Sequence, residues 1–182
     1  MSVDPALRDQ ILAAIPSLRA FAISLSGNVD RADDLVQETI LRALANIQSF
    51  QPGTNMPAWL FTILRNLFRS EYRKRRREIE DADGSLAETL KSHPDQMGRV
   101  EFQEFREALA QLPAEQREAL ILVGASGFSY EEAADICECA VGTIKSRVNR
   151  ARSRLAKLLE VENIDEFGPD HATRAVLMRH EN

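Results

Sequence analysis

The sequence contains few cysteines, few aromatic residues and no long apolar run. Two of its 182 residues are cysteine and 6% are aromatic, whereas 44% are hydrophobic. Cys137 and Cys139 lie too close together to staple a fold, which excludes a disulfide framework and suits a reducing compartment. No apolar stretch approaches the ~20 residues that a membrane-spanning helix needs. The many aliphatic residues predict helices packed through Leu, Ile, Val and Ala.

Signals of secretion and of catalysis are also missing. The first residues, MSVDPALRDQ, lack the basic and then apolar order of a signal peptide, so we expect a cytoplasmic protein. We find no nucleophile–base pair, no phosphate-binding loop and no paired catalytic carboxylates. A lone C-x-C motif with three scattered histidines is weak evidence for zinc. We therefore expect no enzymatic activity, no metal and no cofactor.

The net charge of −5 conceals an uneven distribution of charge along the chain. Residues 1–77 carry +4, residues 78–100 carry −4, residues 101–160 carry −2 and residues 161–182 carry −3. Screening removes charge effects beyond about 8 Å at physiological salt, so local clusters matter more than the total. Seven basic residues and one acid lie in 65–77, and six basic residues and no acid lie in 145–157. Two basic helix ends are therefore predicted, one in each half.

Residues 1–77 predict one helical unit. Asp30 could cap a helix that ends before the loop QPGTN, where Pro52 and Gly53 interrupt helical structure. The apolar positions of this helix recur at helical spacing: Val36, Ile40, Ala43, Leu44 and Ile47. A further helix begins near Pro57 and should direct its charged side outward. The residues expected on that outer side are Arg65, Asn66, Arg69, Arg73 and Lys74.

Residues 78–100 are acidic, contain two glycines and a proline, and show no sustained apolar face, which indicates a flexible linker. A second unit follows in 101–160. There Ser129 and Glu132 form a capping-box pattern, which stabilises a helix start by about 1 kcal/mol. After the turn ECAVG comes a helix whose apolar positions are Ile144, Val148, Ala151, Leu155 and Leu158. A short capped helix, a tight turn and a basic helix are typical of a helix-turn-helix.

Three surfaces carry charge patterns with more than one interpretation. The last helix could read base edges in the major groove or be a solvated charged helix, although it lacks the acids that a solvated face usually mixes in. The basic run in 65–77 could bind DNA, compensate a helix dipole or resemble a nuclear localisation signal. The acids of DRADDLVQET could serve the helix N-terminus or meet a basic protein partner.

Taken together, these segments resemble the extracytoplasmic-function sigma factors of the sigma-70 family. DDLVQETILRAL, SFQPGTN and PAWLFTILRNLFRSEYRKRRR resemble the sigma-2 domain, and LPAEQREALILVGASGFSYEEAADICECAVGTIKSRVNRARSRL resembles the sigma-4 domain. The latter wording is also similar to the general-stress-response branch of alphaproteobacteria. The resemblance implies an all-α fold with sigma-2 in 1–77, an acidic linker in 78–100 and a helix-turn-helix sigma-4 domain in 101–160. The tail 161–182 matches no known segment.

The resemblance also implies partners and residue roles. Core RNA polymerase would be bound through its beta-prime clamp and beta flap, promoter DNA would be recognised, and an anti-sigma factor would hold the protein inactive. The core-binding residues would be Asp33, Asp34, Leu35, Gln37, Glu38 and Thr39. The minus-10 residues would be Ser49, Phe50, Gln51, Gly53, Thr54, Asn55, Trp59, Asn66, Arg69 and Arg73. The minus-35 residues would be Thr143, Lys145, Ser146, Arg147, Asn149, Arg150 and Arg154.

The length of the linker bears on whether the minus-10 and minus-35 promoter elements could be bound at the same time. Promoter elements roughly 17 base pairs apart are about 58 Å apart, at 3.4 Å per pair. A free 23-residue chain averages about 26 Å end to end and reaches about 75 Å when extended. Both units can therefore reach their elements only if core polymerase stretches the linker. Without core, the two units could fold against each other.

Two other functions stay open. A sigma-like adaptor would sequester an anti-sigma factor without binding DNA, but such adaptors usually carry a receiver domain. An ordinary helix-turn-helix regulator would have no need of the DDLVQET segment.

Overall fold

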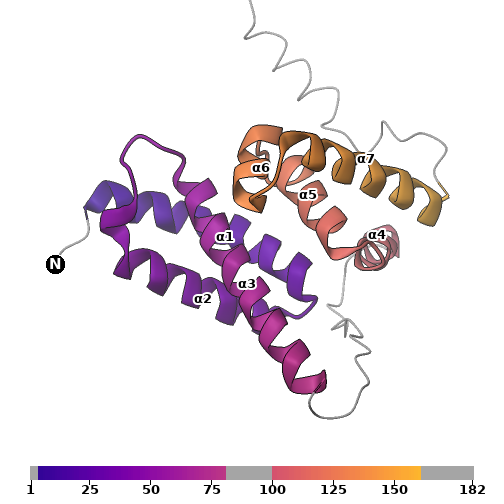
Figure 1. The fold of residues 1–182 in the computed structure, drawn as a ribbon, viewed down its shortest axis with the longest axis horizontal. Helices are drawn as coiled ribbons and strands as arrows, with labels where there is room; N and C mark the ends of the chain where they lie inside the picture. The colour runs from indigo at the N-terminus through magenta and orange to yellow at the C-terminus, as the bar shows by residue number, and fades with distance from the viewer. Residues whose placement is uncertain (1–3, 81–99, 161–182) are drawn as a thin grey trace, which may run out of the picture.

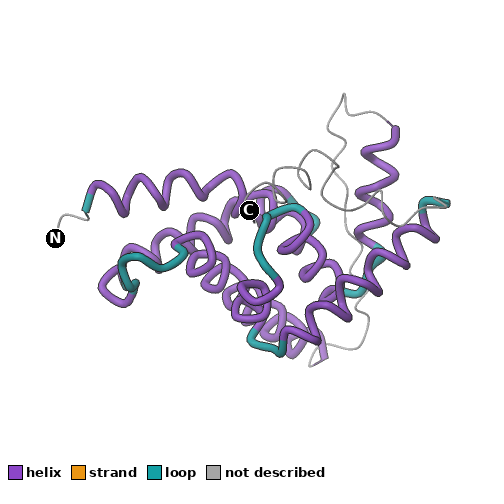
Figure 2. The backbone as a smooth tube through the Cα atoms, turned by 90° about the horizontal axis from the view of Figure 1, so that it is seen from above, coloured by secondary structure: helices purple, strands orange, loops and turns teal. Residues whose placement is uncertain are grey.

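The computed structural model describes residues 4–80 and 100–160, and within these ranges the regular structure is entirely helical (Figures 1 and 2). The first unit consists of α1 (Pro5–Ser26), α2 (Val29–Ala45), the 3-10 turn η1 (Ile47–Ser49) and α3 (Met56–Glu80). The second consists of α4 (Val100–Ala110), α5 (Ala114–Gly124), α6 (Tyr130–Cys137) and α7 (Val141–Leu158). The predicted all-α fold is confirmed.

The helices of the first unit begin at side-chain caps. The Asp4 carboxylate accepts a hydrogen bond from the backbone N–H of Ala6, and Asn28 caps α2 by accepting from the N–H of Arg31 at 2.9 Å. The prediction that Asp30 caps α2 is wrong, because the helix already begins at Val29. Asp30 lies in the first turn, where its charge favours the positive end of the helix dipole.

The three helices of the first unit pack around an aliphatic core to which Leu18, Leu35, Leu60 and Leu64 contribute. Leu44, expected in this core, is instead 37% exposed. Helix α3 ends at Glu80, three residues inside the range assigned to the linker, and α4 begins at Val100. The rest of that range and the tail 161–182 lie outside the described residues.

The second unit is the predicted helix-turn-helix. The Ser129 hydroxyl accepts from the N–H of Glu132 at 3.0 Å, and the Glu132 carboxylate accepts from the N–H of Ser129 at 2.9 Å, which completes the capping box. Glu138 ends α6 in the left-handed conformation, with φ 53°. Ala140 is the N-cap residue of α7 and provides no side-chain hydrogen bond to the helix start.

The apolar side of α7 is buried against α5 and α6. Four of its five predicted positions, Ile144, Val148, Ala151 and Leu155, are at most 1% exposed. Leu158 is 37% exposed, so the prediction was wrong at the last position. The buried side rigidly orients the basic side toward solvent.

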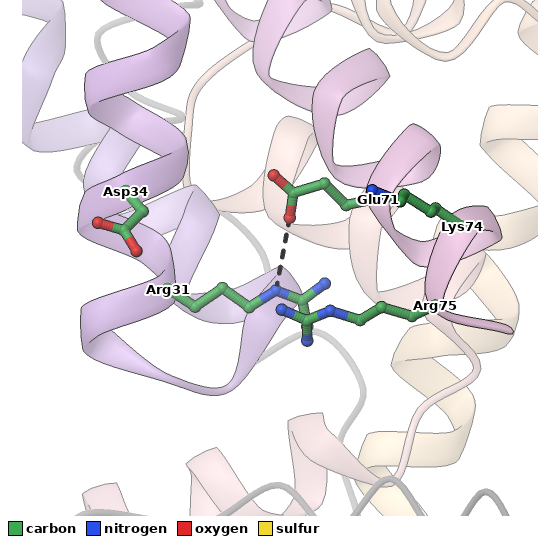
Figure 3. A pocket seen from close by; sticks show the side chains of 5 residues that line it. All are labelled: Arg31, Asp34, Glu71, Lys74 and Arg75. Atoms are coloured by element: carbon green, nitrogen blue, oxygen red, sulfur yellow. Dashed lines mark ion pairs between the residues drawn. The ribbon is translucent and has the colours of Figure 1, made fainter. Parts of the chain in front are cut away.

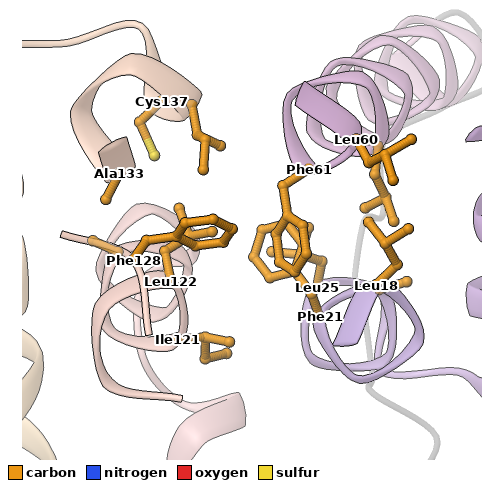
Figure 4. Close-up of a cluster of buried hydrophobic side chains, with 14 of the residues drawn as sticks. Leu18, Phe21, Leu25, Leu60, Phe61, Ile121, Leu122, Phe128, Ala133 and Cys137 are labelled. Atoms are coloured by element: carbon orange, nitrogen blue, oxygen red, sulfur yellow. The ribbon is translucent and has the colours of Figure 1, made fainter. Parts of the chain in front are cut away.

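The two units pack directly against each other (Figure 4). Phe61 of α3 stacks on Phe21 of α1 at 5.0 Å between ring centroids, and meets the edge of Phe128, which precedes α6, at 4.9 Å. Ile121, Leu122, Ala133 and Cys137 complete the second unit's side of this cluster. One continuous apolar core therefore joins the two halves of the chain.

Candidate nucleic-acid and polymerase interfaces

The exposed side of α2 carries only part of the predicted core-binding set. Asp34 and Gln37 are exposed. Asp33 is exposed too, but its carboxylate accepts a hydrogen bond from Arg19 Nε at 2.6 Å, and the Arg19 guanidinium lowers the pKa of Asp33. Glu38 is half-buried and pairs with Arg42 one turn further on, at 2.7 Å.

Leu35 and Thr39 face the opposite way, into the core. They are 1% and 0% exposed, and the Thr39 hydroxyl donates to the Leu35 carbonyl at 2.7 Å. In this structure, neither side chain is available to a partner. They hold α2 in place, and the exposed side chains next to them form the surface that a partner can contact.

Two leucines on this surface were missed. Leu41 is 56% exposed and Leu44 is 37% exposed, and with Asp34 and Gln37 they recur at steps of three, four and three along α2. This spacing places them on one side of the helix. The signal was present in the sequence, but Leu44 was assigned to the core and Leu41 to no surface. The resulting "α2 stripe" (Asp34, Gln37, Leu41 and Leu44) combines an acid, an amide and exposed apolar surface, which suits a protein partner.

The loop between α2 and α3 presents a polar edge supported by aromatic residues. Most of its predicted minus-10 residues are exposed: Ser49, Gln51, Gly53, Thr54 and Asn55. Phe50 is buried, and its ring lies 5.3 Å from that of the half-buried Trp59. Gly53 has φ +90°, a conformation that favours glycine and lets the loop reverse tightly. Phe50 therefore anchors the loop, while the polar side chains remain at its edge.

Helix α3 contributes three exposed predicted residues, Asn66, Arg69 and Arg73. Arg65 was expected beside them but is only 1% exposed, and its Nε donates to the Glu118 carboxylate of α5 at 2.6 Å. The prediction was wrong because the second unit covers this side of α3 and supplies the opposite charge.

A polar cleft of about 290 Å³ separates the α2 stripe from the basic end of α3 (Figure 3). Arg31, Asp34, Glu71, Lys74 and Arg75 line it. The Arg31 guanidinium lies 3.8 Å from the Glu71 carboxylate and 5.3 Å from the centre of the Phe68 ring. Because both signs of charge line the cleft, it favours neither a free anion nor a free cation.

The basic side of α7 is the most exposed cationic surface of the second unit. Five of the seven predicted minus-35 residues are exposed, Lys145, Ser146, Asn149, Arg150 and Arg154, and Thr143 is half-buried. The Lys145 ammonium lies 5.7 Å from the centre of the Tyr130 ring, so α6 helps to orient it.

Arg147 differs from the other predicted minus-35 residues. Its guanidinium donates to the Glu115 carboxylate of α5 at 2.5 Å and lies 3.7 Å from Cys139 Sγ, and its side chain is 20% exposed. These contacts engage Arg147 inside the unit. Its observed role is to brace α7 against α5 and the turn.

The pKa shifts in this unit follow from the same packing. Hydrogen bonds from the Ser129 N–H and from Asn55 lower the pKa of Glu132 despite its partial burial. Burial, with the nearby Glu118 carboxylate, raises the pKa of Cys137 to about 12. Cys137 and Cys139 serve as packing residues around the turn.

Comparison with known proteins identifies the family of this chain. Residues 11–78 match the family model for sigma-70 region 2, and residues 102–155 match that for sigma-70, region 4. Over 177 residues, 97% of this chain and 98% of the relative, the sequence is 75% identical to the ECF RNA polymerase sigma factor EcfG of Rhodopseudomonas palustris. The chain is an ECF sigma factor.

Solved structures of sigma factors agree with this assignment. The sigma factor RpoE of Bartonella quintana, solved in complex with the anti-sigma factor NepR, is 56% identical with a TM-score of 0.81, over 88% of this chain and 100% of that one. CnrH, solved with the cytosolic domain of CnrY, is 25% identical with a TM-score of 0.65, over 87% of this chain and 90% of that one.

The comparisons favour the sigma factor over the two alternatives, the sigma-like adaptor and the ordinary helix-turn-helix regulator. The anti-anti-sigma factor PhyR of Bartonella quintana is 20% identical with a TM-score of 0.56, and the match covers 83% of this chain and 49% of that one. That likeness shows the shared fold alone, whereas the 75% identity is to a sigma factor over nearly the whole chain. As a sigma factor, the protein binds core RNA polymerase and directs initiation at specific promoters. Its relatives are not enzymes. No helix in the described ranges has the length and apolarity to cross a bilayer.

Proposed function

We propose that this sigma factor uses three separate surfaces in initiation: the α2 stripe for core polymerase, the α2–α3 loop with α3 for minus-10 DNA, and the basic side of α7 for minus-35 DNA. The domain boundaries proposed are 1–77 for sigma-2, 78–100 for the linker and 101–160 for sigma-4, with α3 running three residues into the linker range. The protein acts in the cytoplasm, without catalysis of its own, on stress-response promoters. The observation that carries this assignment is α7, whose exposed cations Lys145, Arg150 and Arg154 lie away from its buried apolar stripe.

Helix α7 has the form of a major-groove reader. Its exposed first turns carry Lys145, Asn149 and Arg150, and Arg suits guanine as Asn suits adenine. Arg154 lies one turn beyond Arg150, where a helix leaving the groove meets phosphate. Because α5 and α6 hold the buried side, the helix can enter a groove without rearranging its unit.

The α2–α3 loop has the form of a single-strand reader. Its exposed amides and hydroxyls can pair with unstacked bases, and the half-buried Trp59 ring offers a partly accessible aromatic surface next to them. Arg69 and Arg73 follow at helical spacing on α3 and would neutralise the adjoining backbone phosphates.

Run-off transcription tests this function directly. The family resemblance implies a GGAAC-like minus-35 element. With purified core polymerase, the chain should start transcripts from promoters with that element and not from templates in which it is scrambled. Core alone and the chain alone are the controls, and both should be inactive. Equal transcription from intact and scrambled templates would contradict sequence reading by α7.

An anti-sigma factor is the proposed regulator. The support is that RpoE, 56% identical to this chain, was solved in complex with the anti-sigma factor NepR. Co-purification from the native host should therefore recover a small protein with this chain during unstressed growth, and less of it under stress. A matched purification of core polymerase controls for contaminants. If polymerase subunits alone co-purify in every condition, this partner is wrongly assigned.

A further inference from the structure

The first exposed cation of α7 has an aromatic neighbour on α6. The Lys145 ammonium lies 5.7 Å from the centre of the Tyr130 ring. This separation is within the ~6 Å over which the face of an aromatic ring attracts a cation. Within residues 4–80 and 100–160, the ammonium forms no ion pair with a carboxylate. The ring is therefore the contact that orients Lys145 in the described part of the chain.

The fold holds the Tyr130 ring in place from both directions along the chain. Tyr130 is the first residue of α6 and directly follows Ser129, whose capping box with Glu132 fixes the helix start. Phe128, on the other side of Ser129, is buried, and Tyr130 itself is half-buried against the core. Because α6 packs against α7, the ring is a fixed point beside the flexible lysine side chain (Figure 1).

A ring and a carboxylate hold a cation in different ways. Further along α7, the Arg147 guanidinium donates to the Glu115 carboxylate, so its charge is neutralised and its donors are engaged within the unit. An aromatic face attracts a cation through its quadrupole and carries no net charge. Lys145 therefore keeps its positive charge, and the N–H groups that point away from the ring remain available to a base edge.

We propose that Tyr130 is a positioning residue that sets base preference in the minus-35 element by holding the Lys145 ammonium. Lysine can donate to the O6 and N7 acceptors of guanine in the major groove. An unrestrained lysine is a point charge on a flexible stem, and it can reach acceptors of neighbouring base pairs as well. The ring restricts that movement, which confines the contact to one base position and lowers the entropy lost on binding. This inference rests on the proposed reading of the minus-35 element by α7, and it adds a residue of α6.

Tyr130→Leu tests the role of the ring, because leucine keeps an apolar side chain without an aromatic face. Tyr130→Phe is the matched comparison, since it keeps the ring and removes only the hydroxyl. Holoenzyme made with each full-length variant transcribes from single-base variants of the minus-35 element. Tyr130→Leu should reduce the discrimination at one base position by about twofold to fivefold, the factor expected of an exposed cation–π contact, and Tyr130→Phe should retain it. An even loss at all promoters, or unchanged discrimination, would overturn the proposal.

A double variant shows whether Tyr130 acts through Lys145. Lys145→Ala alone should relax the preference at the same base position. Addition of Tyr130→Leu to Lys145→Ala should change that preference no further, because the contact between the two side chains is already absent. If Tyr130→Leu reduces discrimination by the same factor with and without Lys145, the ring does not act through the lysine and the proposal is wrong.

Two further comparisons keep the outcomes distinct. If circular dichroism shows that Tyr130→Leu is unfolded, a trifluorinated phenylalanine at position 130 replaces it, because fluorine withdraws electron density from the ring face and keeps the ring shape. Its discrimination should fall below that of Tyr130→Phe, and equal values would reject the proposal. An effect of Lys145→Ala without an effect of either ring variant refutes this inference alone. If Lys145→Ala leaves every base preference unchanged, the proposed reading by α7 is wrong at Lys145 and this inference falls with it.

Discussion

Replacing Asp34 and Glu38 together by lysine should lower the affinity for core polymerase by about tenfold to a hundredfold, with the fold retained. Both residues lie on the solvent side of α2, next to the exposed Leu41. A single surface ion pair contributes only ~0–1 kcal/mol, so removal of one charge would be hard to detect. Reversal of two charges adds repulsion from a basic partner to the loss of attraction. Competition with a second sigma factor for limiting core measures the effect.

The control for this variant follows from the pair that Glu38 makes with Arg42. Glu38→Lys breaks that pair, which is worth about 0.3–0.5 kcal/mol on a helix surface. Arg42→Ala breaks the same pair without reversing the charge of the surface, and should compete nearly as well as the wild type. If the double variant has a native circular dichroism spectrum and competes for core as well as Arg42→Ala does, α2 does not carry the polymerase contact.

The second large effect is expected on promoter choice. Arg150→Ala should cost ~1–3 kcal/mol at promoters with the preferred minus-35 element and relax the preference at one base position. The reason is that Arg150 lies on the exposed first half of α7, which is the part that would enter the groove. Transcription from a set of single-base promoter variants, at several salt concentrations, measures the change.

Arg154→Ala is the matched comparison, because it removes the same side chain one turn further along α7. It should weaken binding evenly across promoters and reduce the salt dependence by about one phosphate contact. If both substitutions lower all promoters by the same factor, Arg150 contacts phosphate and the register of α7 in the groove differs from the one proposed.

The local features of the chain were predictable from the sequence because they depend on residues close to one another. The capping box of Ser129 and Glu132 involves positions three apart, and the buried stripe of α7 repeats every three or four residues. The same periodicity placed the cations of α7 opposite the stripe. These two features sufficed to predict the helix-turn-helix and its basic side.

The errors concern which sides of a helix are covered by a distant segment. Periodicity shows which side of a helix is apolar, but not what covers the remaining sides. Leu44 was assigned to the core because it is apolar, yet no helix within residues 4–80 and 100–160 covers that side of α2. Arg65 was assigned to solvent because it is charged, yet Glu118, 53 positions away, meets it in a buried interface.

The sequence by itself determined the helices, the capping box of Ser129 and Glu132, the two basic ends and the family resemblance, all of which arise from local order along the chain. Only the tertiary structure decided that Asn55 and Asn66 are engaged by α6 and that Arg147 braces α7 against Glu115. The physical reason is that each of these side chains meets a complementary group that is distant in the sequence and is brought to it only by the fold. That arrival depends on how the helices pack in three dimensions, within a unit and between the two units, and no spacing along the chain encodes it.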